Sequence, residues 1–131
     1  MANILLLEPD TVMARQYVVA LSSAGHTCFR SASAQKALAV LDDQSIDAVL
    51  MELQLGQHNG LEFLYEIRTY GDLRNLPVVI ISSVDPGLVQ SASTYGLLRI
   101  SEYLYKPTIK LTQIVTAIND ALPASVRSNV S

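Results

Sequence analysis

Four polar side chains of the kind that bind metal ions or phosphate groups stand far apart in the sequence. Each ends or follows a short apolar run: Glu8, Glu52, Ser82 and Lys106. Carboxylates supply the oxygen ligands that suit Mg²⁺, and a lysine ammonium offsets the charge of a phosphoryl group. None of these residues is specific alone, so the prediction depends on a fold that brings the four together.

The apolar runs before these residues are predicted to be β-strands. They are short and largely apolar on both faces, as in strands that helices cover on both sides. The runs span residues 4–7, 27–30, 48–53, 78–82 and 103–105.

Segments with the apolar period of a helix lie between these runs. The first carries apolar residues at i, i+3, i+4 and i+7, namely Ala14, Tyr17, Val18 and Leu21. Similar periods cover residues 34–41, 60–67 and 111–118, and a less regular helix is expected at about residues 86–95. Asp10 and Ser33 are the expected N-caps of the first two helices, while Gly25 and Pro123 are the expected stops of the first and last.

Strict alternation of strand and helix predicts right-handed βαβ units and a parallel sheet with helices on both faces. Five strands fit a doubly wound α/β fold with the strand order 2-1-3-4-5, which is the flavodoxin-like arrangement. Ligands of such folds bind beyond the carboxyl ends of the strands, near the switch point between strands 1 and 3. All four polar residues are expected at that edge.

Composition excludes several classes of protein. A chain of 131 residues is the length of one domain, and its net charge of −3 argues against nucleic-acid binding. Its single cysteine, Cys28, cannot form an intramolecular disulfide, which fits the cytoplasm. The sequence shows neither a signal peptide nor an apolar stretch near the ~20 residues that span a bilayer. We expect a soluble cytoplasmic protein with no membrane partner, in which residues 1–122 form the domain and residues 123–131 a linker or disordered tail.

The ordered motifs of the chain resemble the CheY-like receiver domain of two-component response regulators over about residues 3–122. They are ILLLEPD, DAVLMELQLGQHNG, LPVVIISS and YLYKP. The resemblance implies a signalling domain rather than an enzyme. By position, Glu52 takes the place of the phospho-accepting aspartate and Glu8 the first acidic position. Ser82 and Tyr103 match the switch residues, and Lys106 matches the phosphate-contacting lysine.

The sequence departs from the family pattern where the metal is held. Glu52 is one methylene longer than aspartate, and Pro9, which has no carboxylate, occupies the second acidic position. Asp10 is the other acid of this pocket, although its position fits an N-cap better. The resemblance therefore implies no firm cofactor. Mg²⁺ would be bound weakly at most, by Glu8, Glu52 and the backbone carbonyl of Gln54, because it needs near-octahedral oxygens at about 2.0–2.1 Å.

Two expectations concern the connections around the last strand. Residues 96–102 are longer than the usual link into strand 5 of the family. The peptide bond between Lys106 and Pro107 is expected to be cis, as is typical of the family.

The leading functional hypothesis is an atypical receiver that works without phosphorylation, through protein–protein interaction or dimerisation. The resemblance places its interface on helix 4, strand 5 and helix 5, with Leu88, Tyr95, Glu102 and Tyr103. A sensor kinase, an effector domain or a second copy would be the partner.

Alternatives to this hypothesis stay open at the level of the sequence. One is a phosphorylation-competent receiver in a two-component phosphorelay. Another concerns Glu52, which either mimics the phosphorylated state or forms a stabilising ion pair with Lys106. A flavodoxin-like cofactor binder is disfavoured, because the turn after the first strand lacks a glycine-rich or hydroxyl-rich phosphate cradle.

Overall fold

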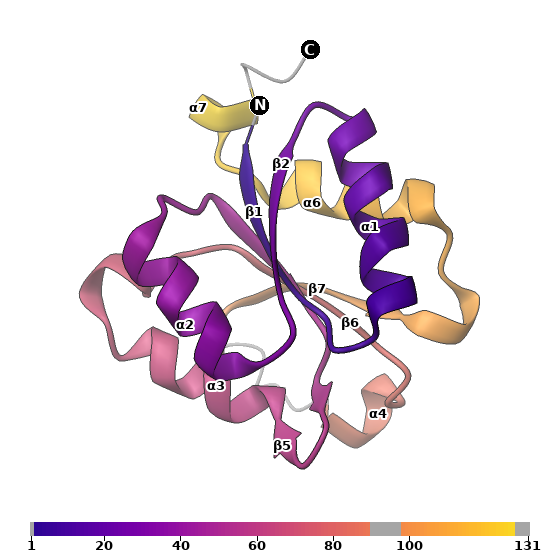
Figure 1. Cartoon of the computed structure of the whole chain (residues 1–131), viewed down its shortest axis with the longest axis horizontal. Coiled ribbons are helices and arrows are strands. Elements are labelled where there is room, and N and C mark those ends of the chain that lie inside the picture. Colours follow the sequence, from indigo (N-terminus) through magenta and orange to yellow (C-terminus); the bar gives the residue numbers. More distant parts are fainter. Residues whose placement is uncertain (1, 90–97, 128–131) are drawn as a thin grey trace.

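A five-stranded parallel sheet forms the centre of the computed structural model, which describes residues 2–89 and 98–127 (Figure 1). The strand order is β2-β1-β3-β6-β7, so the predicted doubly wound α/β fold with the order 2-1-3-4-5 is confirmed. The strands are, in chain order, β1 (Asn3–Leu7), β2 (Thr27–Ser31), β3 (Ala48–Met51), β6 (Val78–Ser82) and β7 (Ile100–Tyr105).

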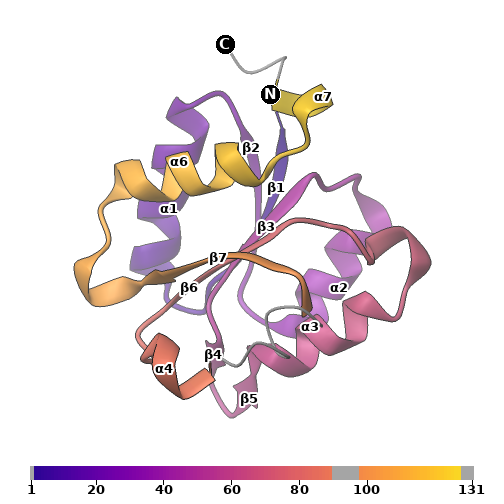
Figure 2. The ribbon, with the colours of Figure 1, turned by 180° about the vertical axis from the view of Figure 1, so that it is seen from behind.

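Helices cover both faces of the sheet, as Figures 1 and 2 show from opposite sides. On one face lie α1 (Thr11–Ser23) and α6 (Leu111–Ala121), and on the other α2 (Ala34–Asp43) and α3 (Gly60–Arg68). The shorter elements are α4 (Pro86–Val89), α7 (Ala124–Arg127) and the 3₁₀ turns η1 (Gly71–Leu73) and η2 (Lys106–Thr108).

The central strands are apolar throughout because both of their faces are buried. In β1, Ile4 and Leu6 belong to the core under α1 and α6, whereas Leu5 and Leu7 belong to the core under α2 and α3. Each of these four side chains is fully buried. Burying one such side chain stabilises the fold by about 1.5–3 kcal/mol. The strand β1, which was predicted from its apolar residues alone, therefore stabilises both cores.

The predicted ends of two strands were wrong. β3 stops at Met51, two residues before the end of its apolar run. β7 starts at Ile100 rather than Tyr103, because the exposed polar residues Ser101 and Glu102 separate Ile100 from the apolar run. Val78 pairs with Ile100 and Val79 with Glu102, so one extra residue forms a bulge there. Residues 100–102 therefore belong to the strand and not to a long link, while residues 90–97 lie outside the described parts.

A small antiparallel hairpin follows β3. It pairs β4 (Gln54–Leu55) with β5 (His58–Asn59) across a two-residue loop. Gly56 opens that loop with a φ of +69°, which fits the first central position of a type II′ turn. The polar sequence of this stretch lacks the alternation of a strand, so the hairpin was not predicted.

The helices α1 and α2 begin directly after their predicted N-cap residues. Asp10 accepts a hydrogen bond from the Met13 amide at the start of α1, and Ser33 accepts one from the Lys36 amide at the start of α2. Gly25 follows the C-terminus of α1 with a φ of +94°. These contacts satisfy N–H groups that a helix cannot bond internally.

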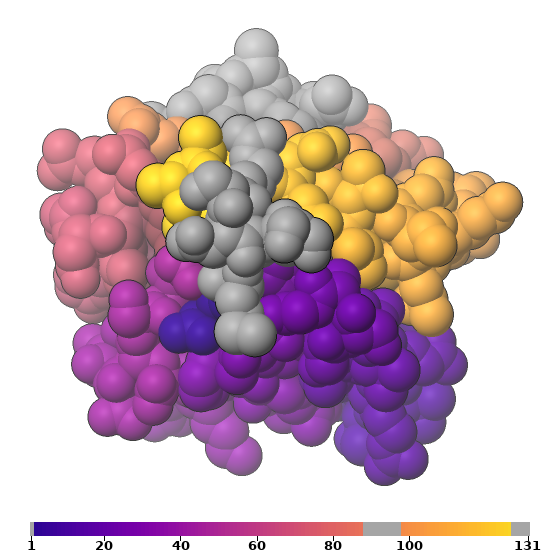
Figure 3. Space-filling view, turned by 90° about the horizontal axis from the view of Figure 1, so that it is seen from above, coloured from indigo at the N-terminus to yellow at the C-terminus, as the bar shows by residue number. Residues whose placement is uncertain are grey.

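Two parts of the chain differ from the sequence-based expectations. Part of the segment predicted as a linker is the helix α7, whose Val126 packs against the core. Figure 3 shows this helix, in yellow, on the same face of the molecule as the indigo start of the chain. The Lys106–Pro107 peptide was expected to be cis, but the described backbone contains no cis bond; Pro107 lies instead within the turn η2, whose helical geometry is built from trans peptides.

Helix α4 covers the first four residues of the segment predicted as the fourth helix.

None of the helices within residues 2–89 and 98–127 is long and apolar enough to cross a membrane.

Replacing Gly60 with alanine is expected to destabilise the protein by about 1–3 kcal/mol. A Cβ there would lie 2.8 Å from Met51 Cε, 3.0 Å from the Glu52 carbonyl oxygen and 3.0 Å from Leu53 Cα. Because two of these atoms are backbone, α3 would have to move away from β3. Urea unfolding measures the loss. Gly71→Ala is the control, since its Cβ would meet nothing within 4 Å; equal stability of the two variants would contradict the prediction.

Candidate functional site

Three strands bring two carboxylates and one ammonium group together at their carboxyl ends. Leu7 of β1 pairs with Met51 of β3, so the next residues, Glu8 and Glu52, lie side by side. Lys106 follows β7 and reaches across β6. Its Nζ lies 2.8 Å from Glu8 Oε1 and 2.9 Å from Glu52 Oε1. We call these three residues the carboxylate–lysine triad.

The remaining carboxylate oxygens of the triad accept hydrogen bonds from the backbone. Glu8 Oε2 accepts from the Asp10 amide at 3.1 Å. Glu52 Oε2 accepts from the amides of Leu53 at 2.6 Å and Gln54 at 3.1 Å. The extra methylene of glutamate lets the Glu52 carboxylate turn back onto the peptide that follows it. All four oxygens are therefore engaged by groups of the chain itself.

Burial makes these contacts energetically important. Glu8 is 2% exposed and Glu52 4%. An unpaired charge at such positions would cost several kcal/mol, so each carboxylate depends on Lys106. Burial lowers the pKa of Lys106, but the hydrogen bonds and charges of Glu8 and Glu52 outweigh it, so this pKa lies well above its usual value. The ammonium stays charged, and the triad carries a formal charge of about −1 when both carboxylates are ionised.

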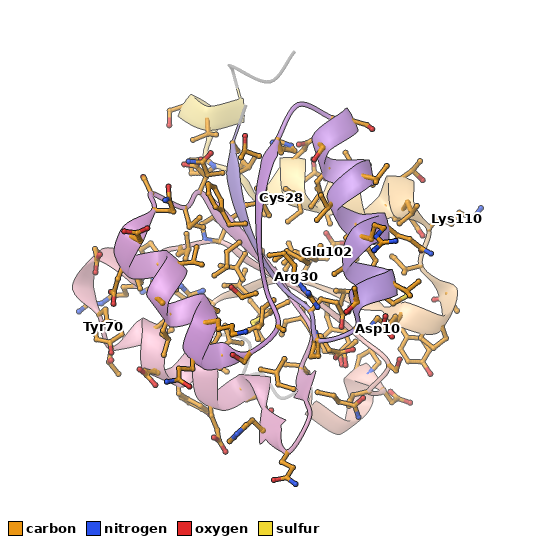
Figure 4. The ribbon with its side chains drawn as sticks, viewed as in Figure 1. Asp10, Cys28, Arg30, Tyr70, Glu102 and Lys110 are labelled. Atoms are coloured by element: carbon orange, nitrogen blue, oxygen red, sulfur yellow. The ribbon has the colours of Figure 1, made fainter. Side chains whose placement is uncertain are left out.

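Arg30 is a neighbour of the triad that sequence reasoning missed. From the end of β2 its Nε and Nη2 donate to the Glu8 carbonyl at 3.1 and 2.8 Å, and Nη2 also donates to the Pro9 carbonyl at 3.1 Å. Figure 4 shows Arg30 and Asp10 close to the turn between β1 and α1. The guanidinium fixes the backbone that carries Glu8. The sequence signal that could have identified Arg30 is a charged residue at the end of a predicted strand.

Tyr17 of α1 is a second group that sequence reasoning placed only in the core. Its side chain is fully buried, and its hydroxyl has no hydrogen-bond partner among the described residues. Burial raises the pKa of Tyr17 to about 12; the charge of Lys106 opposes this shift, and the charges of Glu8 and Glu52 add to it. The phenol therefore lies within the electrostatic field of the triad.

The two predicted switch residues meet at the turn after β6. Ser82 is fully buried, and its hydroxyl accepts from the Val84 amide at 3.2 Å. The Tyr103 hydroxyl donates to the Val84 carbonyl at 2.6 Å. Both side chains thus hold the backbone at Val84.

Other predicted site and interface residues are placed as follows. Asp10 is exposed and caps α1 with its side chain, so only its backbone amide contacts the triad. Gln54 is exposed and contacts Glu52 through its amide. Glu102 is exposed on β7. The side chain of Leu88 and the whole of Tyr95 lie outside what the structure describes.

The triad as it stands does not fit a magnesium site. The Lys106 ammonium lies between the two carboxylates, where a divalent cation that bridged them would have to bind. The other two oxygens face backbone amides. Across residues 2–89 and 98–127, no group of three or more His, Cys, Asp or Glu residues is placed to hold a metal ion. Mg²⁺ would have to displace these contacts before it could bind with near-octahedral geometry.

Replacing Lys106 with methionine is expected to destabilise the protein by about 3–5 kcal/mol, because two buried carboxylates lose their counter-charge. Urea unfolding at neutral pH measures the loss. Lys36→Met, which alters an exposed lysine of α2, serves as the control and should change little. Adding Glu8→Gln and Glu52→Gln to Lys106→Met should recover part of the stability. A loss equal to that of the Lys36 variant would contradict the role of Lys106.

The free energy of unfolding is expected to fall as the pH rises above about 10. In the unfolded chain the pKa values are about 10.4 for lysine and about 10 for tyrosine. The pKa values of Lys106 and Tyr17 are higher in the folded chain, which therefore keeps protons that the unfolded chain has released. This stability is complete below that range and is lost as the pH rises through it, for Tyr17 up to about pH 12.

Tyr17→Phe separates the contribution of the phenol. It removes a buried hydroxyl without a partner, so stability at neutral pH should be unchanged or higher by up to about 1 kcal/mol. Its alkaline decline should also be shallower than that of the wild type. Denaturation curves recorded from neutral to alkaline pH measure both effects, and parallel declines would show that Tyr17 does not contribute.

Comparisons with known proteins identify the family of the chain. The sequence model of the response regulator receiver domain matches residues 4–119. The alginate biosynthesis transcriptional regulatory protein AlgB of Pseudomonas aeruginosa is 30% identical over 105 residues, which are 80% of this chain and 22% of that protein. The transcriptional regulatory protein MalR of Bacillus subtilis is 27% identical over 122 residues, which are 92% of this chain and 50% of that protein. The chain thus spans at most half the length of these two relatives.

Solved structures share the fold. A sensor protein from Polaromonas sp. JS666 superposes with a TM-score of 0.83 at 24% identity, over 99% of this chain and 98% of that one. The Mn²⁺-bound form of the response regulator Rcp1 superposes with a TM-score of 0.74 at 25% identity, over 95% of this chain and 100% of that one.

The matched range runs from β1 into α6 and so covers the sheet and all three residues of the triad. The chain therefore belongs to the response regulator receiver domain family of two-component signalling, with the CheY-like fold of a signalling module.

Proposed function

We propose that this receiver domain signals without being phosphorylated and acts by binding protein partners through the face formed by β7 and α6. The observation that carries this proposal is the carboxylate–lysine triad. Its ammonium pairs with both buried carboxylates, at the place where a typical receiver uses a metal ion and a phosphoryl group.

The geometry of Glu52 disfavours phosphoryl transfer. That reaction depends on positioning and on charge neutralisation by a metal ion. Freeing the Glu52 carboxylate would break its contacts with Lys106 and with the amides of Leu53 and Gln54. Hydrogen bonds to charged groups contribute about 1.5–3 kcal/mol each. Pro9 offers no carboxylate that could hold a metal and lower this cost.

The same contacts favour an ion pair over a permanent mimic of the phosphorylated state. Glu52 directs one oxygen to Lys106 and the other to its own backbone. The Ser82 hydroxyl, which would report a phosphoryl group, accepts from Val84. A carboxylate also carries one negative charge where a phosphoryl group approaches two. We therefore assign Glu52 a structural role that fixes the strand ends in one arrangement.

The proposed partner surface is a shallow groove between the edge strand β7 and the helix α6. Its volume is about 280 Å³, and its lining residues are Glu102, Leu104, Thr112, Gln113, Thr116, Ala117 and Asp120. Two of these are acidic, so a partner with basic side chains fits it best. The effector part of a longer regulator, a sensor kinase or a second copy of the chain would supply them. Transcriptional regulators among the relatives make an effector domain the first partner to test.

Incubation with acetyl phosphate and Mg²⁺ should leave the intact mass of the protein unchanged, because Glu52 is engaged and the metal site is incomplete. The matched control is the double variant Pro9→Asp, Glu52→Asp, which restores both acidic positions of the family pattern. This variant should gain the mass of one phosphoryl group. A phosphoryl adduct on Glu52 of the wild-type protein would overturn the proposal.

A further inference from the structure

A second charged cluster lies at the opposite end of the sheet from the triad. The C-terminus of α3, the turn η1 and the start of β7 bring together Arg68, Arg74 and Arg99 around a hollow of about 300 Å³. We call this group the arginine cluster. It stands out because the chain as a whole carries a net charge of −3. The proposal drawn from it does not depend on the function proposed for the triad.

Arg68 is held in place by neutral groups. Its Nε donates to the Leu98 carbonyl at 2.8 Å, its Nη1 to the Leu73 carbonyl at 2.8 Å and its Nη2 to the Arg99 carbonyl at 3.3 Å. These bonds use three of the five N–H groups of a guanidinium. The side chain is therefore fixed in position while its charge is not neutralised.

Arg99 has an unusual backbone and a similar neutral partner. Its φ is +55°, and among the described residues no other non-glycine residue has a positive φ. Such a conformation costs energy for a residue with a Cβ and is retained where the surroundings enforce it. Its Nη1 donates to the side-chain oxygen of Asn75.

No carboxylate within the described ranges pairs with the arginine cluster. The ion pairs found there both belong to Lys106. Burial and the nearby charge of Arg99 lower the pKa of Arg68, as expected when like charges approach without a counter-ion. Two oriented guanidinium groups, and a third on the exposed Arg74, thus gather positive charge that no ion pair within the described residues neutralises.

The rest of the hollow offers an apolar and aromatic wall. Tyr65 is 49% exposed and lines it together with Leu98 and Thr69. A volume of about 300 Å³ is at the lower end of the range for small-molecule sites and larger than a single phosphate needs. Guanidinium groups pair with phosphate oxygens in a bidentate geometry, and tyrosine rings stack on nucleobases.

We propose that the arginine cluster binds a nucleoside diphosphate, with its phosphates on Arg74 and Arg99 and its base against Tyr65. Arg68 positions the backbone of Arg99 and adds positive charge. Several negative charges in one small ligand match several guanidinium groups better than a single carboxylate does.

The test is a calorimetric titration of the full chain with ADP, with amide NMR shifts to locate the site. ADP should bind saturably and shift the amides around Tyr65, Arg74 and Arg99, whereas adenosine should not bind. Arg74→Gln and Arg99→Gln should each weaken ADP binding about tenfold, the loss expected of one charge-assisted contact. Arg15→Gln, which removes an exposed arginine from α1, should leave ADP binding unchanged. Tyr65→Ala should weaken ADP binding and leave pyrophosphate binding as it is.

Three results would overturn the proposal. The first is the absence of saturable ADP binding to the wild-type chain. The second is an equal loss of affinity in the Arg15 and Arg99 variants, which would indicate attraction by overall charge. The third is a set of amide shifts that maps elsewhere, for example to the triad. Thermal unfolding of each variant without ligand shows whether it is folded, and Arg68 is left unchanged because its three backbone contacts hold the fold.

Discussion

The interaction on which this domain depends is the sharing of one buried ammonium by two buried carboxylates. Lys106 lies within 2.9 Å of both Glu8 and Glu52, and neither glutamate has appreciable contact with solvent. Charges at such depth are tolerated only when they are paired and hydrogen-bonded. Lys106 stands 98 positions after Glu8 and 54 positions after Glu52 in the sequence, so the contact ties the end of the last strand to the ends of the first and third strands.

The fold sets this contact up through the register of its strands. β1 and β3 place the two glutamates side by side, β7 presents the lysine, and Arg30 holds the carbonyl groups of Glu8 and Pro9. A typical receiver fills the same edge with a metal ion and, after activation, a phosphoryl group. Here the Lys106 ammonium contacts both carboxylates, and one oxygen of the longer Glu52 side chain faces its own backbone. In the function that we propose, this arrangement keeps the domain in one stable state with a constant binding face.

Most of the fold and much of the site were predictable from local signals. The apolar runs predicted the strands. The polar residues at the ends of these runs predicted the residues of the triad, because the carboxyl ends of parallel strands lie at one edge of the sheet. The start of β7 was missed since the exposed Ser101 and Glu102 interrupt its apolar residues, and the hairpin after β3 was missed since its polar residues do not alternate. Tyr17 was predicted as a core residue, but its place in the field of the triad arises from tertiary packing. The arginine cluster likewise joins residues from α3, the segment after η1 and the start of β7, which no sequence spacing links.

The central claim is that Lys106 occupies the place of the metal ion, and a magnesium titration followed by amide NMR tests it most directly. The amides to follow are those of Glu8, Glu52 and Gln54. The account predicts no saturable shift of these signals through millimolar Mg²⁺ in the wild-type chain. Saturable shifts centred on these three amides would show that Mg²⁺ displaces the ammonium, and they would contradict the account.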